Sequence, residues 1–183
     1  MSRNYVMIGF MGSGKTTVSR YLSTHYGFTL RDTDSMIELA TGKTIGLIFR
    51  EDGEEAFRDA ETALLTRMCQ ESGGESMEEG SEAPGTVIST GGGIILRKEN
   101  RDLLRQIGEV IYLRIQPETV LKRLRRDRKR PLLQGSDREK KVRELMALRE
   151  PMYLEAADRI LDVDDSTPDR TARIILGETA AQK

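Results

Sequence analysis

The stretch GFMGSGKTT, Gly9 to Thr17, decides the fold class because it spells a G-x-x-x-x-G-K-T phosphate-binding loop directly after an apolar run. In such a loop, successive backbone N–H groups surround phosphates, and the N-terminus of the following helix adds a favourable dipole. Lys15 is expected to reach the β- and γ-phosphates, and the Thr16 hydroxyl is expected to ligate Mg²⁺. The stretch therefore predicts a nucleotide site and leaves the phosphate acceptor open.

Short apolar, β-branched runs alternate with helical patterns along the rest of the chain. The expected strands cover residues 5–10, 28–32, 86–90, 109–115 and 159–163, and the expected helices begin near Lys15, Ser35, Gly53, Leu96, Pro117, Asp137 and Pro168. This alternation predicts an α/β fold with a parallel sheet covered by helices on both faces. Ligands of such folds gather at the carboxyl ends of the strands, so the segments 9–17, 32–34 and 91–93 should face one crevice.

Length and composition indicate one domain of 183 residues with a formal net charge of −1, which favours neither a nucleic-acid nor a membrane partner. The lone Cys69 excludes an internal disulfide, fits a reducing cytoplasm and is expected to be structural. No apolar run approaches the length of a membrane span. The segment 71–85 holds five Glu and four Gly, which predicts a flexible acidic insertion within the single domain.

Two carboxylates, Asp32 and Asp34, follow the second expected strand. In an extended chain this spacing points both side chains the same way, so one could lie near Mg²⁺ while the other accepts a hydroxyl proton. Alternatively, Asp34 could cap a helix that begins at Ser35. No strand-terminal Asp precedes the glycines at 91–93, so Asp32 is the best candidate for the Mg²⁺-organising acid.

The glycines Gly91, Gly92 and Gly93 end the third expected strand, and three residues without side chains indicate that a ligand or another backbone approaches closely. A simple flexible turn is the alternative. In the helix that contains FRDAE, Arg58 and Glu61 are three residues apart, which is equally typical of a surface ion pair and of an arginine held ready for an anion.

The segment 122–135 has six basic residues among positions 123–130, with no aromatic residues interleaved. A solvated helix end or a nucleic-acid patch is one interpretation, but a lid of about residues 123–136 that closes over phosphates explains it better. Arg130 is the strongest candidate in it for contacting transferred charge. Arg149 continues an apolar helical stripe, so it requires either an anionic partner or a route to water.

Taken together, GFMGSGKTT, DTD, FRDAE, STGGG, RPLL and REPMY resemble the shikimate kinase family in both order and spacing. The resemblance spans nearly the whole chain except the acidic insertion. It implies strand order 2-3-1-4-5, a mobile lid and a helical substrate-binding segment after the second strand. It also implies ATP-dependent, Mg²⁺-dependent phosphorylation of the 3-hydroxyl of shikimate. We further expect the chain to be a monomer.

The resemblance also implies a role for each matching residue. The loop residues Gly12, Ser13, Gly14, Lys15, Thr16 and Thr17 would hold ATP, with Thr16 on Mg²⁺ and Asp32 nearby through water. Arg123 would pack against adenine, and Pro168 would lie in the adenine-side loop after the last strand. Asp34 would help to deprotonate the attacking hydroxyl, and Arg130 would neutralise the transferring phosphoryl group. Arg58 and Arg149 would bind the shikimate carboxylate, and Gly91, Gly92 and Gly93 would line the same pocket.

Three rival functions remain at this point. Gluconate kinase and nucleoside monophosphate kinases also combine a phosphate-binding loop with a basic lid. From another class, the chain could be a non-catalytic nucleotide-dependent module, although intact Lys15, Asp34 and Arg130 count against it.

Overall fold

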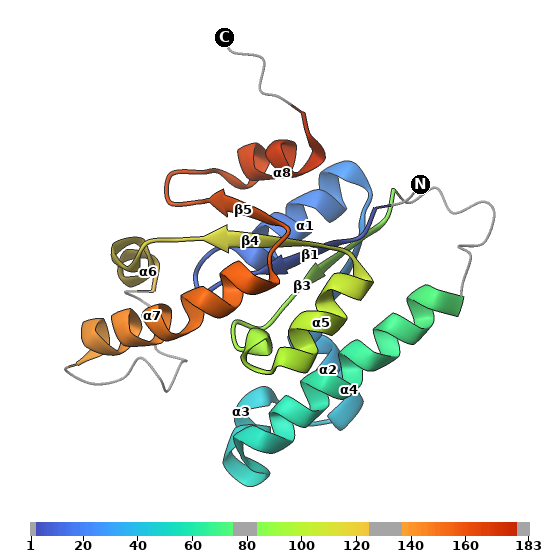
Figure 1. The fold of residues 1–183 in the computed structure, drawn as a ribbon, viewed down its shortest axis with the longest axis vertical. Helices are drawn as coiled ribbons and strands as arrows, with labels where there is room; N and C mark the ends of the chain where they lie inside the picture. The colour runs from blue at the N-terminus through green and yellow to red at the C-terminus, as the bar shows by residue number, and fades with distance from the viewer. Residues whose placement is uncertain (1–2, 75–83, 125–136, 179–183) are drawn as a thin grey trace.

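The computed structural model describes residues 3–74, 84–124 and 137–178, and its centre is a five-stranded parallel sheet (Figure 1). The strands lie in the order β2 (Thr29–Asp32), β3 (Thr86–Ser89), β1 (Tyr5–Ile8), β4 (Glu109–Arg114) and β5 (Arg159–Asp162). All five expected strands are present, shorter by one or two residues. The structure thus confirms the α/β class and the order 2-3-1-4-5.

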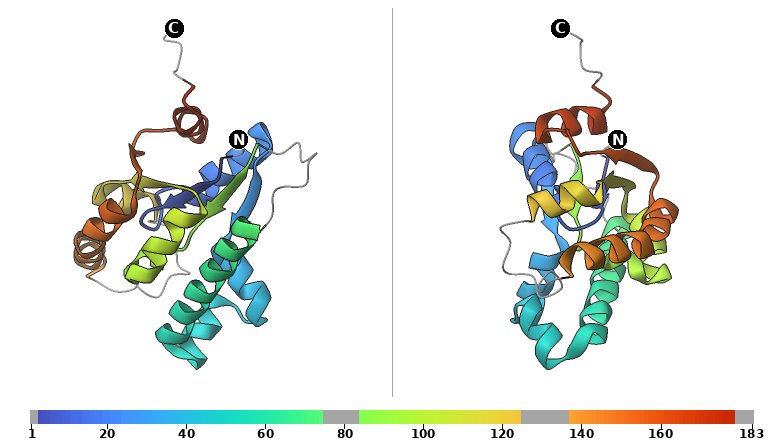
Figure 2. Two further views of the ribbon diagram at one scale, coloured as in Figure 1. Left: turned by 45° about the vertical axis from the view of Figure 1, so that its right-hand side comes forward. Right: turned by 90° about the vertical axis from the view of Figure 1, so that its left-hand side faces the viewer.

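Helices cover both faces of the sheet, which gives three layers (Figures 1 and 2). The helices α1 (Lys15–Tyr26) and α8 (Pro168–Leu176) pack together on one face. On the other face lie α5 (Lys98–Ile107) and α7 (Arg138–Ala156), with α4 (Gly53–Gly74) packed outside α5 and α6 (Pro117–Arg123) packed against α7. Four of these helices begin where the sequence predicts, and α5 follows a short 3-10 helix, η1 (Ile94–Leu96).

The segment after β2 differs from the expectation in two ways. Helix α2 (Thr33–Thr41) begins two residues before Ser35, because the Asp32 side chain accepts a hydrogen bond from the Ser35 N–H at 3.1 Å and caps the helix. A separate short helix, α3 (Ile45–Glu51), follows; the sequence patterns do not identify its start. Its seven residues are too few to show a helical period.

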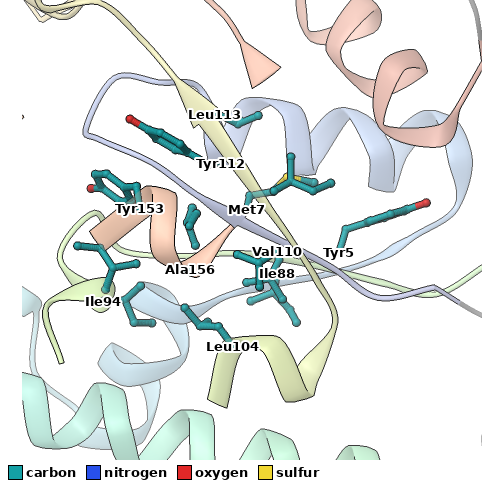
Figure 3. Close-up of a cluster of buried hydrophobic side chains, with 14 of the residues drawn as sticks. Tyr5, Met7, Ile88, Ile94, Leu104, Val110, Tyr112, Leu113, Tyr153 and Ala156 are labelled. Carbon is teal, nitrogen blue, oxygen red and sulfur yellow. The ribbon is translucent and has the colours of Figure 1, made fainter. Parts of the chain in front are cut away.

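The core lies around the central strands, where apolar side chains from sheet and helices pack together (Figure 3). Every residue of β1 is buried, which is typical of a parallel strand that is covered on both faces. Cys69 is half-buried, and its thiol lies 3.5 Å from the Leu103 carbonyl oxygen. Burial raises the pKa of this thiol, which supports a structural role.

The acidic segment 71–85 begins inside α4, which continues to Gly74. Glu71 forms ion pairs with Arg31 at 2.8 Å and with Arg67 at 3.4 Å, which favours helix over loop at this point. Residues 75–83 lie outside the described residues, so the predicted flexibility of the insertion stays a prediction. Within the described ranges, no helix is both long and apolar enough to cross a bilayer.

Candidate active site

The phosphate-binding loop connects the buried strand β1 to α1 at the carboxyl edge of the sheet (Figure 1). Gly14 precedes α1 with φ of 95°, a left-handed conformation that glycine adopts without a Cβ penalty. Lys15, the first residue of α1, folds back over the loop and donates to the carbonyl oxygens of Gly9 at 2.8 Å and Phe10 at 3.1 Å. The ammonium group is therefore held within the loop that precedes it.

A cavity of about 330 Å³ opens beside this loop. It is bounded by the loop, the start of α1, the end of α6, and the segment from the end of β5 into α8; its lining residues are Gly12, Ser13, Gly14, Thr17, Val18, Arg123, Val163, Ser166, Pro168 and Thr171. The structure thus brings Arg123 and Pro168, which are far apart in the sequence, to the same cavity as the phosphate-binding loop.

Arg123 joins two walls of this cavity through its guanidinium group. Its Nη1 donates to the Gly12 carbonyl oxygen at 3.1 Å, and its Nη2 donates to those of Val163 at 2.8 Å and Asp164 at 3.0 Å. Three acceptors from two segments hold the planar group in one orientation. The loop and the end of β5 are thereby fixed relative to each other.

Residues with oxygen-bearing side chains lie on neighbouring strands where β2 and β3 end. The Thr16 and Ser89 hydroxyl oxygens are 3.1 Å apart, and Ser89 pairs in register with Asp32. Hydroxyl and carboxylate oxygens suit Mg²⁺, which commonly takes one or two protein ligands and completes its shell with water and substrate phosphates. Within the described ranges no cluster of three or more His, Cys, Asp or Glu could hold a metal alone. The donor types of Thr16 and Asp32 are those that fit a site shared with water and substrate phosphates.

Asp34 lies in the first turn of α2, not in extended chain, so the prediction that Asp32 and Asp34 point the same way from a strand is wrong in its premise. The alternative in which Asp34 caps the helix is also wrong, because Asp32 is the cap. The Asp34 carboxylate instead lies against the glycine turn. A Cβ built on Gly91 would lie 2.6 Å from Asp34 Oδ1, so a side chain at this position would displace the carboxylate.

Arg58 and Glu61 form a buried pair on α4, with Arg58 Nη1 2.7 Å from Glu61 Oε2, and Glu54 binds Arg58 Nη2 at 2.9 Å. Glu61 has no exposed surface, so this is not a surface ion pair. A Cβ on Gly93 would lie 2.6 Å from Arg58 Nη1, so a side chain at this position would displace the guanidinium group.

Burial and neighbouring charges act on this pair in opposite directions. Burial raises the pKa of the Glu61 carboxyl to about 7, although Arg58 opposes the rise. The nearby Asp34 carboxylate raises the Glu61 pKa further. Burial lowers the pKa of the Arg58 guanidinium, but Glu61 and Glu54 outweigh burial and leave it above its usual value. The guanidinium therefore stays charged.

Arg149 approaches the same turn from α7. It is buried, with its Cζ 5.9 Å from the centroid of the Phe10 ring and its Nη1 3.5 Å from the Gly92 carbonyl oxygen. The alternative interpretation of its sequence pattern, in which the side chain extends to water, is therefore wrong. Tyr153, one turn later, donates its hydroxyl to the same Gly92 oxygen at 2.5 Å.

Comparison with known proteins assigns this arrangement to a family. A sequence model described as "Shikimate kinase" matches residues 11–180. Shikimate kinase from Pseudomonas syringae pv. tomato is 39% identical over 178 residues, which cover 97% of this chain and 96% of that protein. A solved structure of shikimate kinase from Acinetobacter baumannii, in complex with shikimate, superposes with a TM-score of 0.80 at 36% identity and covers 97% of this chain and 95% of that one.

The chain belongs to the shikimate kinase family.

Membership confirms the resemblance, the fold class and the assignment as a phosphotransferase enzyme that uses ATP. It rules against the non-catalytic module and favours shikimate kinase over the gluconate and nucleotide kinases. Arg130, the lid residue predicted to contact the transferred phosphoryl group, lies outside the described residues, as does most of the predicted lid at 123–136.

Two residues that contact the candidate site residues are not predicted from the sequence. Ser89 is buried between Thr16 and the end of β2, and its place at the end of the expected third strand was a usable signal. Tyr153 is the last residue of the motif REPMY, and the motif alone assigns it no role. Its position four residues after Arg149 places both side chains on one helix face, so helical periodicity could have found it.

Proposed function

We propose that this chain transfers the γ-phosphoryl group of ATP to the 3-hydroxyl of shikimate and so produces shikimate 3-phosphate and ADP. The observation that carries the proposal is the convergence of Asp34, Arg58 and Arg149 on the glycine turn 91–93. Gly92 in turn lies against the phosphate-binding loop. A Cβ built on Gly92 would lie 3.5 Å from the Gly9 carbonyl oxygen and 3.6 Å from the Met11 nitrogen. Acceptor-binding groups and donor-binding groups therefore adjoin.

In the donor half, the amides from Gly12 to Thr17 surround the ATP phosphates and the Lys15 ammonium exchanges its carbonyl acceptors for phosphate oxygens. Adenine occupies the cavity between Arg123 and Pro168. The three carbonyl bonds that fix Arg123 support this role, because a guanidinium held in one plane presents a flat face on which a base can stack.

Mg²⁺ would be held by the Thr16 hydroxyl directly and by Asp32 through water. When bound, the ion supplies charge neutralisation between the β- and γ-phosphates and orients them for in-line transfer. The Ser89 hydroxyl, 3.1 Å from that of Thr16, orients the threonine oxygen.

In the acceptor half, Arg58 and Arg149 bind the shikimate carboxylate. Glu54 and Glu61 pre-orient Arg58, which lowers the entropy cost of fixing a long side chain when the substrate arrives. Asp34 accepts a hydrogen bond from the attacking hydroxyl and takes its proton as the bond to phosphorus forms. The glycines Gly91, Gly92 and Gly93 line the site. We also assign to Arg130, which lies outside the described residues, the neutralisation of charge on the transferring phosphoryl group.

The test is release of ADP by the purified chain, with shikimate, gluconate and nucleoside monophosphates offered in turn with Mg²⁺ and ATP. Of the acceptors offered, only shikimate is expected to be phosphorylated. ³¹P NMR of the product should show the phosphate on the 3-hydroxyl. Absence of shikimate turnover would sink the proposal. We further propose that the chain acts as a cytoplasmic monomer, which sedimentation with and without substrates and localisation of a tagged chain in cells would check.

A further inference from the structure

The carbonyl group of Gly92 occupies a central position in the proposed site. A Cβ built on Gly92 would lie within 3.6 Å of backbone atoms of Gly9 and Met11, which belong to the donor half of the site. The glycines on either side of it contact Asp34 and Arg58. Because the peptide group is planar and trans, the direction of the Gly92 C=O also fixes the direction of the Gly93 N–H. Whatever holds this carbonyl sets the geometry of the acceptor site.

Tyr153 is the group that holds it most closely. The phenol donates to the Gly92 oxygen at 2.5 Å, whereas the Arg149 guanidinium lies at 3.5 Å, near the limit of a hydrogen bond. The Tyr153 side chain is only 1% exposed, so water does not compete for this bond. Burial raises the pKa of the Tyr153 hydroxyl, which keeps it protonated and able to donate.

Tyr153 is itself fixed from the sheet side. Its ring stacks on that of Tyr112 from β4, with centroids 4.9 Å apart and planes inclined by 14°, and the two rings lie side by side in Figure 3. The Tyr112 hydroxyl in turn donates to the Glu150 carboxylate, one turn before Tyr153 on α7. The stacked pair therefore connects the sheet to the glycine turn through a side chain that has little freedom to move.

We propose that Tyr153 is a positioning residue for the acceptor substrate: its hydroxyl fixes the orientation of the Gly92–Gly93 peptide and thereby the mutual placement of Asp34 and Arg58. The inference rests on the proposed function, because it assigns Tyr153 to the shikimate half of the site. It requires that loss of the hydroxyl affect shikimate more than ATP. A purely structural role would lower stability and affect neither substrate selectively.

The decisive variant is Tyr153→Phe, which keeps the ring and its stacking and removes only the hydroxyl. Its KM for shikimate is expected to rise about tenfold, as for the loss of one hydrogen bond to a buried acceptor, while its KM for ATP stays within about twofold of wild type. The matched control is Tyr26→Phe, which removes the hydrogen bond from that phenol to Glu178 and leaves the Gly92 carbonyl bound. Its KM for shikimate should remain that of wild type.

Two outcomes would overturn the inference: a Tyr153→Phe enzyme with wild-type KM for shikimate, or equal rises in KM for both substrates. Activity of the wild-type chain decides the proposed function separately, since that function fails only if wild type itself does not phosphorylate shikimate.

A measurement on the unsubstituted protein keeps the inference testable even if Tyr153→Phe does not fold. Uniform ¹³C,¹⁵N-glycine labelling with a carbonyl–amide correlation selects consecutive glycines, which in this chain are 73–74, 91–92 and 92–93. The carbonyl resonance of Gly92 should lie downfield of that of Gly91, because it accepts a short phenolic hydrogen bond, and it should keep this position when shikimate is added. A Gly92 resonance at the ordinary position of a solvated glycine carbonyl would contradict the inference.

Discussion

Arg58 and Glu61 form an ion pair of 2.7 Å on one face of α4, at a place where the Glu61 side chain has no contact with solvent. The pair stands between Asp34, whose carboxylate raises the pKa of Glu61, and Gly93, whose missing side chain makes room for the Arg58 guanidinium. A buried pair of this kind stabilises little by itself, because desolvation offsets the attraction. Under the proposed function, the pair holds a cation ready for an anionic substrate.

The raised pKa of Glu61 makes stability depend on pH. Its folded-state pKa of about 7 exceeds the ordinary value of 4.5, so the folded protein binds more protons than the unfolded chain between these values. The contribution of this carboxyl to the free energy of unfolding is therefore greatest at acidic pH and is lost as the pH rises through about 7. Glu61→Gln should remove this component, which urea unfolding on either side of that pH would detect. Parallel pH profiles for wild type and variant would contradict the prediction.

Asp34→Asn should lower kcat by at least about 100-fold, because the amide cannot accept the hydroxyl proton. ATP binding, measured by calorimetry in the absence of shikimate, should persist, since Asp34 adjoins Gly91 rather than the nucleotide cavity. Asp102→Asn, which breaks an exposed ion pair with Lys98 on α5, is the control and should leave kcat unchanged. Equal loss of ATP affinity would assign Asp34 a role in the fold instead.

Arg149→Ala should raise the KM for shikimate more than tenfold, the cost expected when one of two charged partners of a carboxylate is removed. The KM for ATP should change little. Steady-state kinetics with each substrate varied in turn separates the two. An unaltered KM for shikimate would mean that Arg149 serves only to pack against Phe10 and Gly92.

The glycines Gly91 and Gly93 should differ in their response to alanine. At Gly91 the new Cβ meets the Asp34 carboxylate, and at Gly93 it meets the Arg58 guanidinium, each at 2.6 Å. Gly91→Ala should therefore act mainly on kcat and Gly93→Ala mainly on the KM for shikimate. The two variants serve as controls for each other, and indistinguishable kinetic profiles would refute the assignment of separate roles.

Arg123→Lys should weaken ATP binding without affecting shikimate. A lysine keeps the charge but cannot bind the carbonyl groups of Gly12, Val163 and Asp164 in one plane. The KM for ATP is expected to rise about fivefold, with partial loss of the stabilisation that ATP gives to the Tm. A variant that binds ATP as wild type does would show that charge alone matters at this position.

Most of the fold could be predicted from the sequence because its elements carry local signals. The five strands follow from short β-branched runs, and α6 and α8 begin at prolines that favour the first helical turn. After β2, the local sequence signals did not predict the start of α2 or the presence of α3. There, Asp32 caps α2 through its own side chain, and α3 is too short to show a period, so neither boundary was visible.

The candidate site divides in the same way. The phosphate-binding loop is contiguous in the sequence, and its spacing alone predicts Lys15 as the phosphate-binding lysine and Thr16 as the Mg²⁺ ligand. Ser89 contacts Thr16, which is 73 positions away in the sequence, and Tyr153 contacts Gly92, which is 61 positions away. No local sequence pattern indicates contacts of this kind. For Arg58 the residue type and spacing were known, but they could not distinguish a surface pair from a buried one.

The sequence by itself determined the α/β class, the strand order through the family resemblance, and the phosphate-binding loop, because each depends on neighbouring residues or on motifs in a fixed order. Only the tertiary structure decided that Glu61 is buried beside Arg58, that Asp34 lies against Gly91, and that Tyr153 holds Gly92. Burial and close approach depend on how separate helices and strands pack, and the packing brings α2, α4 and α7 to the single turn that follows β3.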